Sequence, residues 1–161
     1  MEGYLQCMGV ADLAMEAQMK SEQDYESRNV ISIEGNTLHI HKRTKINRFT
    51  EIFELGQEKS SPARTGTKRT TVRLREPGHP GAMVVTTSLP TVTGELRLVE
   101  TRQLAEKGHV VAQELHATNL TTGTKCVTKR IWRRVPLTPE DRASLVEAVP
   151  EVPTGMPPPP P

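Results

Sequence analysis

The fold is decided by the stretch VISIEGNTLHIH, residues 30–41, in which alternating apolar and polar residues turn back at Gly35-Asn36. Two isoleucines before this turn, and Leu38 and Ile40 after it, recur at every second position. A strand places side chains two residues apart on one face, so each arm predicts a strand with one apolar face. A glycine and an asparagine between two such runs are typical of a tight hairpin. The stretch therefore predicts an antiparallel hairpin.

The period of two continues along the chain, and no helical pattern lies between the later strand candidates. Glycine-containing turns separate most of these candidates. This order excludes a parallel α/β sheet and predicts an antiparallel meander that closes into a barrel or folds into a sandwich. The segment from Lys59 to Gly66 is rich in serine, proline and glycine and predicts a loop. The further strand candidates are Phe49–Leu55, Lys68–Leu74, Met83–Leu89, Leu96–Leu104, Val110–Thr118 and Lys125–Arg134.

The two ends of the chain follow other patterns. Residues 1–20 carry apolar side chains at three- and four-residue spacing, interrupted at Gly9, and predict a pair of short helices. Near the other end, Thr138 and Pro139 suit the cap and first position of a helix over Pro139–Val149. The proline-rich residues 150–161 predict a disordered tail of polyproline II character.

The domain organisation follows from this change in composition. We expect one β domain over residues 1–135 and a C-terminal tail over residues 136–161, formed by the short helix and the proline-rich end. At 161 residues the chain has the size of a single domain. That size allows a core or a modest cavity.

Composition excludes several classes of function. The 21 Lys and Arg against 19 Asp and Glu leave a net charge of +2, and aromatic residues make up 3%, which argues against a nucleic-acid partner. The two cysteines, Cys7 and Cys126, have neither metal-ligand spacing nor the density of a disulfide framework. With no apolar leader segment, this usage indicates a cytoplasmic protein. The sequence has no paired carboxylates in a recognisable setting, nucleophile elbow or phosphate loop, so we expect neither an enzyme nor a cofactor.

Candidate binding residues lie on two of the predicted strands. In CVTKRIW, residues 126–132, the period of two places Arg130 and the only tryptophan, Trp132, on one face. In the earlier run 96–104, Arg102 shares its face with three leucines. An arginine on an apolar face needs an anion, because burying an unpaired charge is costly. That anion is either Glu100, on the same face, or a bound carboxylate.

Taken together, several short motifs resemble the intracellular lipid-binding proteins, the fatty-acid- and retinoid-binding family. MEGYLQ at residues 1–6 looks like the start of the first helix of that family, and VISIEGN and FTEIFELGQE, at residues 30–36 and 49–58, look like its next strands. TRQL at 101–104 and KRIW at 129–132 fall where the family has two inward arginines followed by an aromatic residue. The resemblance covers residues 1–135 in the family order.

The resemblance implies an antiparallel up-and-down β-barrel of the β-clam type, with an N-terminal helix pair, that encloses a lipid. It is incomplete here, because the strand that precedes the first helix in the family has no counterpart. Carried over, Arg102 and Arg130 bind the ligand carboxylate, Trp132 stands at the position of a tyrosine, and Phe53 matches an aromatic residue near the ligand portal. The implied function is non-enzymatic binding and transport of a long-chain fatty acid or a retinoid acid.

Other interpretations remain open. In the alternative function the pocket is degenerate, and the chain is an interaction protein that uses its proline-rich tail to bind polyproline-recognising domains. Residues 42–45, Lys-Arg-Thr-Lys, suit a nuclear address or transient membrane contact, although a solvated turn is the simpler interpretation. His39 and His41 share a strand face, but without a third ligand in reach they indicate exposed histidines and no metal site.

Overall fold

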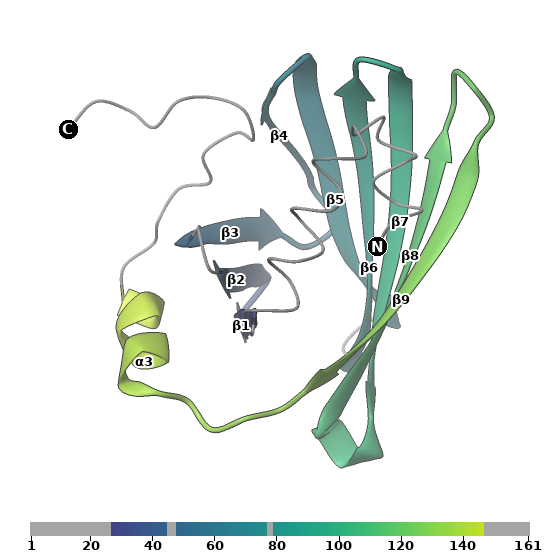
Figure 1. Cartoon of the computed structure of the whole chain (residues 1–161). Coiled ribbons are helices and arrows are strands. Elements are labelled where there is room, and N and C mark those ends of the chain that lie inside the picture. Colours follow the sequence, from purple (N-terminus) through teal and green to yellow (C-terminus); the bar gives the residue numbers. More distant parts are fainter. Residues whose placement is uncertain (1–26, 45–47, 77–78, 147–161) are drawn as a thin grey trace.

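Figure 1 shows the computed structural model, which describes residues 27–44, 48–76 and 79–146. Nine strands, one 3-10 turn and one helix are found in these ranges, and the predicted N-terminal helix pair lies outside them. The elements are β1 (Arg28–Glu34), β2 (Thr37–Arg43), β3 (Arg48–Glu54), β4 (Glu58–Ala63), β5 (Gly66–Glu76), β6 (His79–Thr91), β7 (Gly94–Ala105), η1 (Glu106–Gly108), β8 (Val110–Asn119), β9 (Lys125–Arg133) and α3 (Pro139–Val146).

The strands form two antiparallel sheets that face each other like an open clam (Figure 1). One sheet has the order β1-β2-β3, and the other has the order β4-β5-β6-β7-β8-β9. Consecutive strands pair within each sheet, while β3 and β4 lie in different sheets. Within the described part of the chain, β1 pairs only with β2 and β9 only with β8. The predicted antiparallel meander is therefore confirmed, and its sheet is not closed.

The first hairpin has the predicted register. Ile33 faces Leu38, and Ile31 faces Ile40, so the apolar positions of both arms lie on one face. That face packs against the second sheet. Buried side chains from both sheets meet there in one cluster, which consists of Leu38, Ile40, Phe53, Val72 and Met83. Burial of this apolar surface holds the two sheets together.

The segment Lys59–Gly66 corrects the sequence-based prediction, because most of it is strand β4 and only residues 64–65 form a turn. β4 is the edge of its sheet, where Pro62 is tolerated since one side of an edge strand needs no ladder hydrogen bonds. Lys59 extends from this edge toward the other sheet. Its Nζ donates to the carbonyl of Ile52 at 2.9 Å and lies 5.1 Å from the centre of the Phe53 ring.

The turn between β6 and β7 requires glycine. Gly94 has a φ of +128°, and a Cβ atom added there would lie 2.2 Å from Oγ1 of Thr121. The same turn is held by the loop after β8: the backbone N–H of Glu95 donates to Thr121 Oγ1 at 3.3 Å, and Nδ2 of the buried Asn119 donates to Thr93 Oγ1 at 3.3 Å. Two turns of neighbouring hairpins thus pack as one unit.

The predicted C-terminal helix is confirmed over Pro139–Val146, and its expected end at residue 149 lies outside the described ranges. Thr138 caps it as predicted: the N–H of Asp141 donates to Thr138 Oγ1 at 3.1 Å, and the N–H of Thr138 donates to Asp141 Oδ2 at 2.8 Å. Residues 134–138 carry the chain from β9 to the outer side of the three-stranded sheet, where α3 lies (Figure 1). None of the helices in the described ranges is both long and apolar enough to span a membrane.

Candidate functional site

The register of the larger sheet brings both predicted arginines into one row. Arg102 on β7 faces Gln113 on β8, and Gln113 faces Arg130 on β9. Residues opposite each other in antiparallel strands point to the same face, and neighbouring strands lie about 4.8 Å apart. The two arginines therefore stand about two strand spacings apart with an amide between them. All three side chains are partly buried on the face that looks toward the other sheet.

Arg102 has an anion from its own strand. Its Nε donates to Oε1 of Glu100, and the side chains are 11% and 17% exposed respectively. The ion pair that the sequence offered as one alternative is therefore present. Within the described ranges this is the one ion pair of Arg102, so its two terminal amino groups remain for a further acceptor.

Trp132 also has a hydrogen-bond partner within the chain. Its indole Nε1 donates to Oε1 of Gln113, and Val111 is its direct neighbour on β8. The sequence-based analysis missed Gln113. The sequence does contain a sign of it, because Gln113 is the one polar residue in an alternating series whose other members, Val111, Leu115 and Ala117, are apolar. The amide orients the tryptophan, and it lies between the two arginines.

Phe53 lies on the inner face of the smaller sheet, opposite Leu38. It is 5% exposed and belongs to the cluster in which both sheets meet. In this structure it is a core residue at the contact between the sheets. The polar row of Arg102, Gln113 and Arg130 begins beside this cluster, because Arg102 on β7 faces the cluster residue Met83 on β6, and it runs from there to β9.

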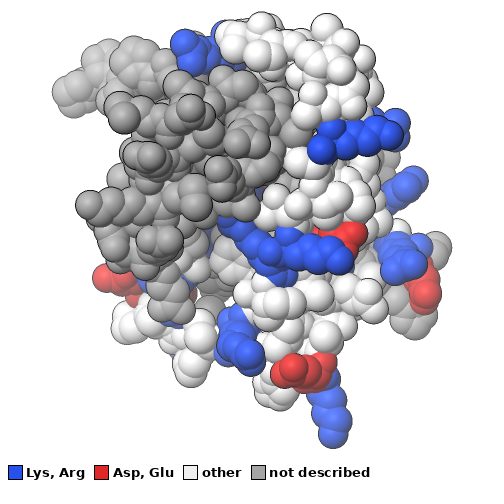
Figure 2. Space-filling model, turned by 45° about the vertical axis from the view of Figure 1, so that its right-hand side comes forward, with Lys and Arg blue, Asp and Glu red and all other residues white. Residues whose placement is uncertain are grey.

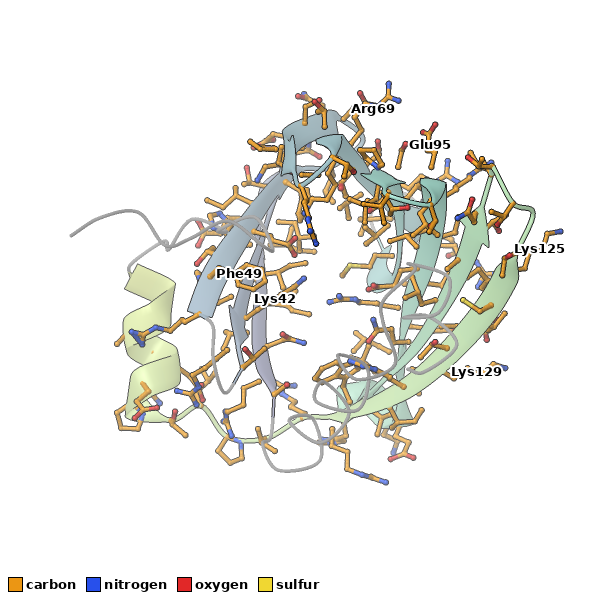
Figure 3. The ribbon with its side chains drawn as sticks, turned by 45° about the horizontal axis from the view of Figure 1, so that its top comes forward. Lys42, Phe49, Arg69, Glu95, Lys125 and Lys129 are labelled. Carbon is orange, nitrogen blue, oxygen red and sulfur yellow. The ribbon has the colours of Figure 1, made fainter. Side chains whose placement is uncertain are left out.

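The basic stretch at residues 42–45 is divided between two faces. Lys42 points inward, where its Nζ lies 2.5 Å from Oε2 of Glu51 and 5.5 Å from the centre of the Phe49 ring (Figure 3). Arg43 points to the outer face and pairs with acids of α3. Lys45 lies outside the described ranges. The two described cations of this stretch are thus paired at the end of a strand rather than solvated in a turn.

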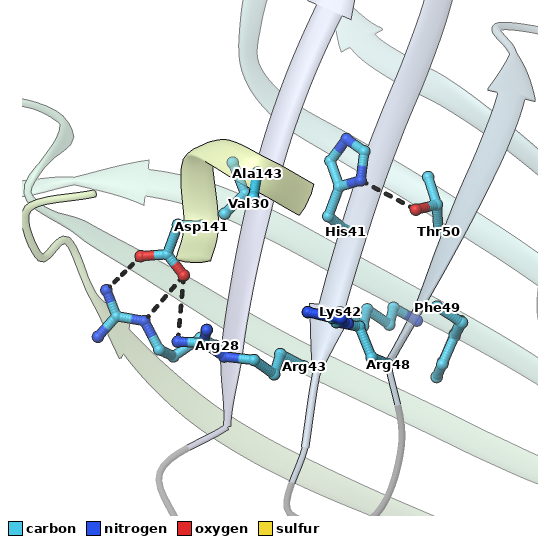
Figure 4. A pocket seen from close by; sticks show the side chains of 10 residues that line it. All are labelled: Arg28, Val30, His41, Lys42, Arg43, Arg48, Phe49, Thr50, Asp141 and Ala143. Atoms are coloured by element: carbon cyan, nitrogen blue, oxygen red, sulfur yellow. Dashed lines mark hydrogen bonds and ion pairs between the residues drawn. The ribbon is translucent and has the colours of Figure 1, made fainter. Parts of the chain in front are cut away.

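A second polar cluster lies on the outer face of the smaller sheet. Arg28, Arg43 and Arg48 face each other in one row across β1, β2 and β3. Like charges in register repel, so this row needs acids. Asp141 of α3 supplies one, with Oδ2 at 2.7 Å from Nη2 of Arg28 and Oδ1 at 3.2 Å from Nη2 of Arg43 (Figure 4). Glu140 pairs with Arg43 as well.

Asp141 is the acid on which this cluster depends. Its side chain is 3% exposed, and its hydrogen bonds with Arg28 lower the pKa of its carboxyl group from 3.8 to about 2. The backbone N–H of Thr138 also stabilises the charged form. A hollow of about 70 Å³ remains between the arginine row and α3. Because the acids of the helix occupy the basic surface, we assign this cluster a structural role and call it the α3 clasp.

The two histidines of β2 share a face as predicted, and their rings stack with centroids 6.3 Å apart. The expectation that both are exposed is wrong for His41, which is buried beside the α3 clasp and bonded to Thr50 at 2.9 Å. Burial lowers the pKa of His41, and the neighbouring His39 lowers it further. Among the described residues, no group of three or more His, Cys, Asp or Glu could hold a metal ion.

Charges on the outer face of the larger sheet are spread out. Lys125 and Lys129 point away from the inner face, and so do Arg69 and Glu95 (Figure 3). In Figure 2, basic side chains alternate with uncharged ones over the described surface in that view and do not gather in one patch.

Comparison with known proteins identifies the fold. No family model and no curated protein sequence matches the chain. Among solved structures, a REP1-NXSQ fatty acid transporter is similar with a TM-score of 0.61 and 18% identity, over 84% of this chain and 86% of that one. Apo lipid binding protein 8 of Caenorhabditis elegans is similar with a TM-score of 0.58 and 16% identity, over 83% and 86%. A fatty acid-binding protein from brain tissue of Drosophila melanogaster has values of 0.57 and 14%, over 81% and 87%.

The structural likeness spans most of this chain and most of each similar protein, while the sequences are less than one fifth identical. The chain therefore has the β-clam fold of the fatty-acid-binding and lipid-binding proteins. The resemblance noted from short motifs is confirmed at the level of fold.

Proposed function

We propose that this chain is a non-enzymatic binding protein for a hydrophobic carboxylate, which it holds between its two sheets. The observation that carries the proposal is the inner row of Arg102, Gln113 and Arg130, which presents two cations and an amide on a face surrounded by apolar side chains. The fold supports the same proposal, because the similar structures are described as a fatty acid transporter, a lipid binding protein and a fatty acid-binding protein.

The physical requirements of such a ligand match the inner face. Each methylene group of a buried chain contributes about 0.8 kcal/mol, so an acyl or polyene tail supplies most of the binding free energy. The carboxylate must exchange water for charge-assisted hydrogen bonds, which arginine provides through a planar set of donors. In our proposal the terminal amino groups of Arg102 and the guanidinium of Arg130 bind the carboxylate beside Trp132, and the tail runs along the inner face toward Phe53. The ligand class is a long-chain fatty acid or a retinoid acid.

Trp132 offers a direct assay, because it is the only tryptophan of the chain and lies beside the proposed head-group site. The purified full chain is titrated with hexadecanoic acid or retinoic acid, and tryptophan fluorescence and calorimetry are recorded. We expect saturable binding near one ligand per chain. Arg130→Gln and Arg102→Gln should each weaken binding about tenfold or more, since each removes a charge-assisted contact.

The matched control is Arg133→Gln, because Arg133 lies on the same strand as Arg130 but on its exposed face. It removes the same charge and should leave binding unchanged. Native mass spectrometry of the protein as expressed provides a second test through a copurified lipid. If the folded chain binds neither acid at any soluble concentration, the proposal is wrong.

A second candidate function is an interaction protein that acts through the proline-rich tail. It is favoured by one observation: Glu100 already neutralises Arg102, and Gln113 already accepts the hydrogen bond of Trp132, from within the chain. Deletion of residues 150–161 separates the two candidates, since lipid binding should survive the deletion and capture of a polyproline-recognising domain should not. A cytoplasmic location, with access to the nucleus, is part of the carrier proposal, and fractionation of cells that express the chain tests it.

A further inference from the structure

We propose that Glu100 is an internal counter-ion that lowers the preference of the pocket for acids over the corresponding neutral alcohols. This inference rests on the proposed function and names the residue that sets its head-group selectivity. In this role Glu100 is a positioning and charge-balancing residue and need not touch the ligand.

The geometry places Glu100 inside the head-group site. It lies two residues before Arg102 on the same face of β7, which corresponds to about 7 Å along a strand. Its direct neighbours across the sheet are Val85 on β6 and Leu115 on β8, both apolar. With an exposure of 17%, and with Arg102 as its ion-pair partner, the carboxylate is poorly solvated. A charge in this setting acts strongly on its neighbours, because the surrounding dielectric is low.

The charge balance gives the direction of the effect. Arg102 and Arg130 each carry a positive charge, and Glu100 carries a negative charge beside Arg102. A bound carboxylate adds a negative charge to the site, and a bound alcohol adds none. Without the charge of Glu100 the site would be more positive by one unit and would attract a carboxylate more strongly. Glu100 therefore opposes the acid in two ways, by repulsion and by occupying Nε of Arg102.

The contact with Arg102 that Glu100 weakens matters more for a carboxylate than for a hydroxyl group. A carboxylate that binds Arg102 can use only the donors that Glu100 leaves, and it must share the guanidinium with a second acid. A hydroxyl head group needs a single partner, and the amide of Gln113 or the terminal amino groups of Arg102 can provide it. An alcohol or an acid of the same chain length buries the same tail. The ratio of their affinities therefore isolates the head-group contribution.

The test measures this ratio on the full chain. Hexadecanoic acid and hexadecanol, and retinoic acid and retinol as a second pair, are titrated against the wild-type chain, Glu100→Gln and the control Glu114→Gln, with Trp132 fluorescence as the readout. Glu114 lies on the exposed face of β8, so its variant removes the same charge from the outside of the sheet. We expect the acid-to-alcohol affinity ratio to rise about tenfold in Glu100→Gln, while Glu114→Gln leaves it unchanged.

A double variant separates charge from shape. Glu100→Gln combined with Arg102→Gln removes one charge of each sign, so the site has the same net charge as in the wild-type chain and the ratio should return to near its wild-type value. Glu100→Leu, which extends the leucine face of β7, serves if the glutamine variant does not fold. If the ligands bind but the ratio is unchanged or falls in Glu100→Gln or Glu100→Leu, the inference is wrong and the carrier proposal stands. If the folded wild-type chain binds none of the four ligands, both fail.

Discussion

The α3 clasp gives the sharpest prediction about stability. Asp141→Asn removes one negative charge that faces Arg28 and Arg43, and it keeps a side-chain oxygen that can accept the hydrogen bond of the Thr138 N–H. The cap of α3 is therefore preserved in the variant. What is lost is the attraction between the acid and a row of arginines that repel each other. We expect the free energy of unfolding to fall.

The magnitude follows from the pKa of Asp141, which is lowered from 3.8 to about 2. One pKa unit corresponds to about 1.4 kcal/mol, so the full shift amounts to about 2.4 kcal/mol. The clasp lies at the outer face of the sheet, where water and salt screen such pairs, which reduces the expected loss to about 1–2 kcal/mol. Glu140→Gln is the control: Glu140 pairs with the same Arg43, but its side chain is 75% exposed, so the loss should stay below about 0.5 kcal/mol.

The assay is urea unfolding followed by circular dichroism at several pH values. Because the folded pKa of Asp141 is lowered, its contribution is complete above about pH 4 and is lost as the pH falls through about 2. The stability difference between the wild-type chain and Asp141→Asn should therefore be present at neutral pH and shrink across this window. A difference that persists unchanged below about pH 2.5, or equal losses in Asp141→Asn and Glu140→Gln, would refute the clasp.

Three further predictions concern the scaffold. Gly94→Ala should cost about 1–3 kcal/mol in urea unfolding, because its Cβ would meet Thr121, and a second variant with Thr121→Gly should recover part of the loss. Leu38→Ala, at a site with no exposed surface, should lower the free energy of unfolding by about 2–5 kcal/mol. Ile52→Ala, at a position on the other face that is 37% exposed, should lower it clearly less, and equal losses would contradict the assigned core. Thr138→Ala should lower the stability of the chain by about 1 kcal/mol through loss of the α3 cap, and the α3 amides should exchange faster. Unchanged exchange of these amides would show that the cap is unimportant.

The candidate site was predicted in part. The period of two was enough to place Arg130 with Trp132, and Arg102 with Glu100, because residues two apart in a strand share a face. It did not reveal that Gln113 joins the two arginines in one row, since that depends on the register of three strands. The choice between Glu100 and a bound acid as the partner of Arg102 also remained open. Both are compatible with the same local pattern.

Some elements could not be predicted at all. Strand β4 was missed because its sequence is polar and contains Pro62, features of a loop that an edge strand also tolerates. The repelling row of Arg28, Arg43 and Arg48 depends on the pairing of β1 with β2 and of β2 with β3. Its acids come from a helix more than 90 residues along the chain from Arg43, and local sequence cannot indicate such a partner.

The sequence alone determined the antiparallel strands other than β4, the glycine turns, the capped C-terminal helix and the pairs of side chains that share a strand face. These features follow from local backbone preferences and from the period of side chains along a strand. Only the tertiary structure decided which faces meet. It placed Phe53 in the contact between the sheets, gave Arg102 its acid and Trp132 its amide, and brought α3 to the arginine row. The physical reason is that register and charge pairing between distant segments depend on the packing of the whole chain.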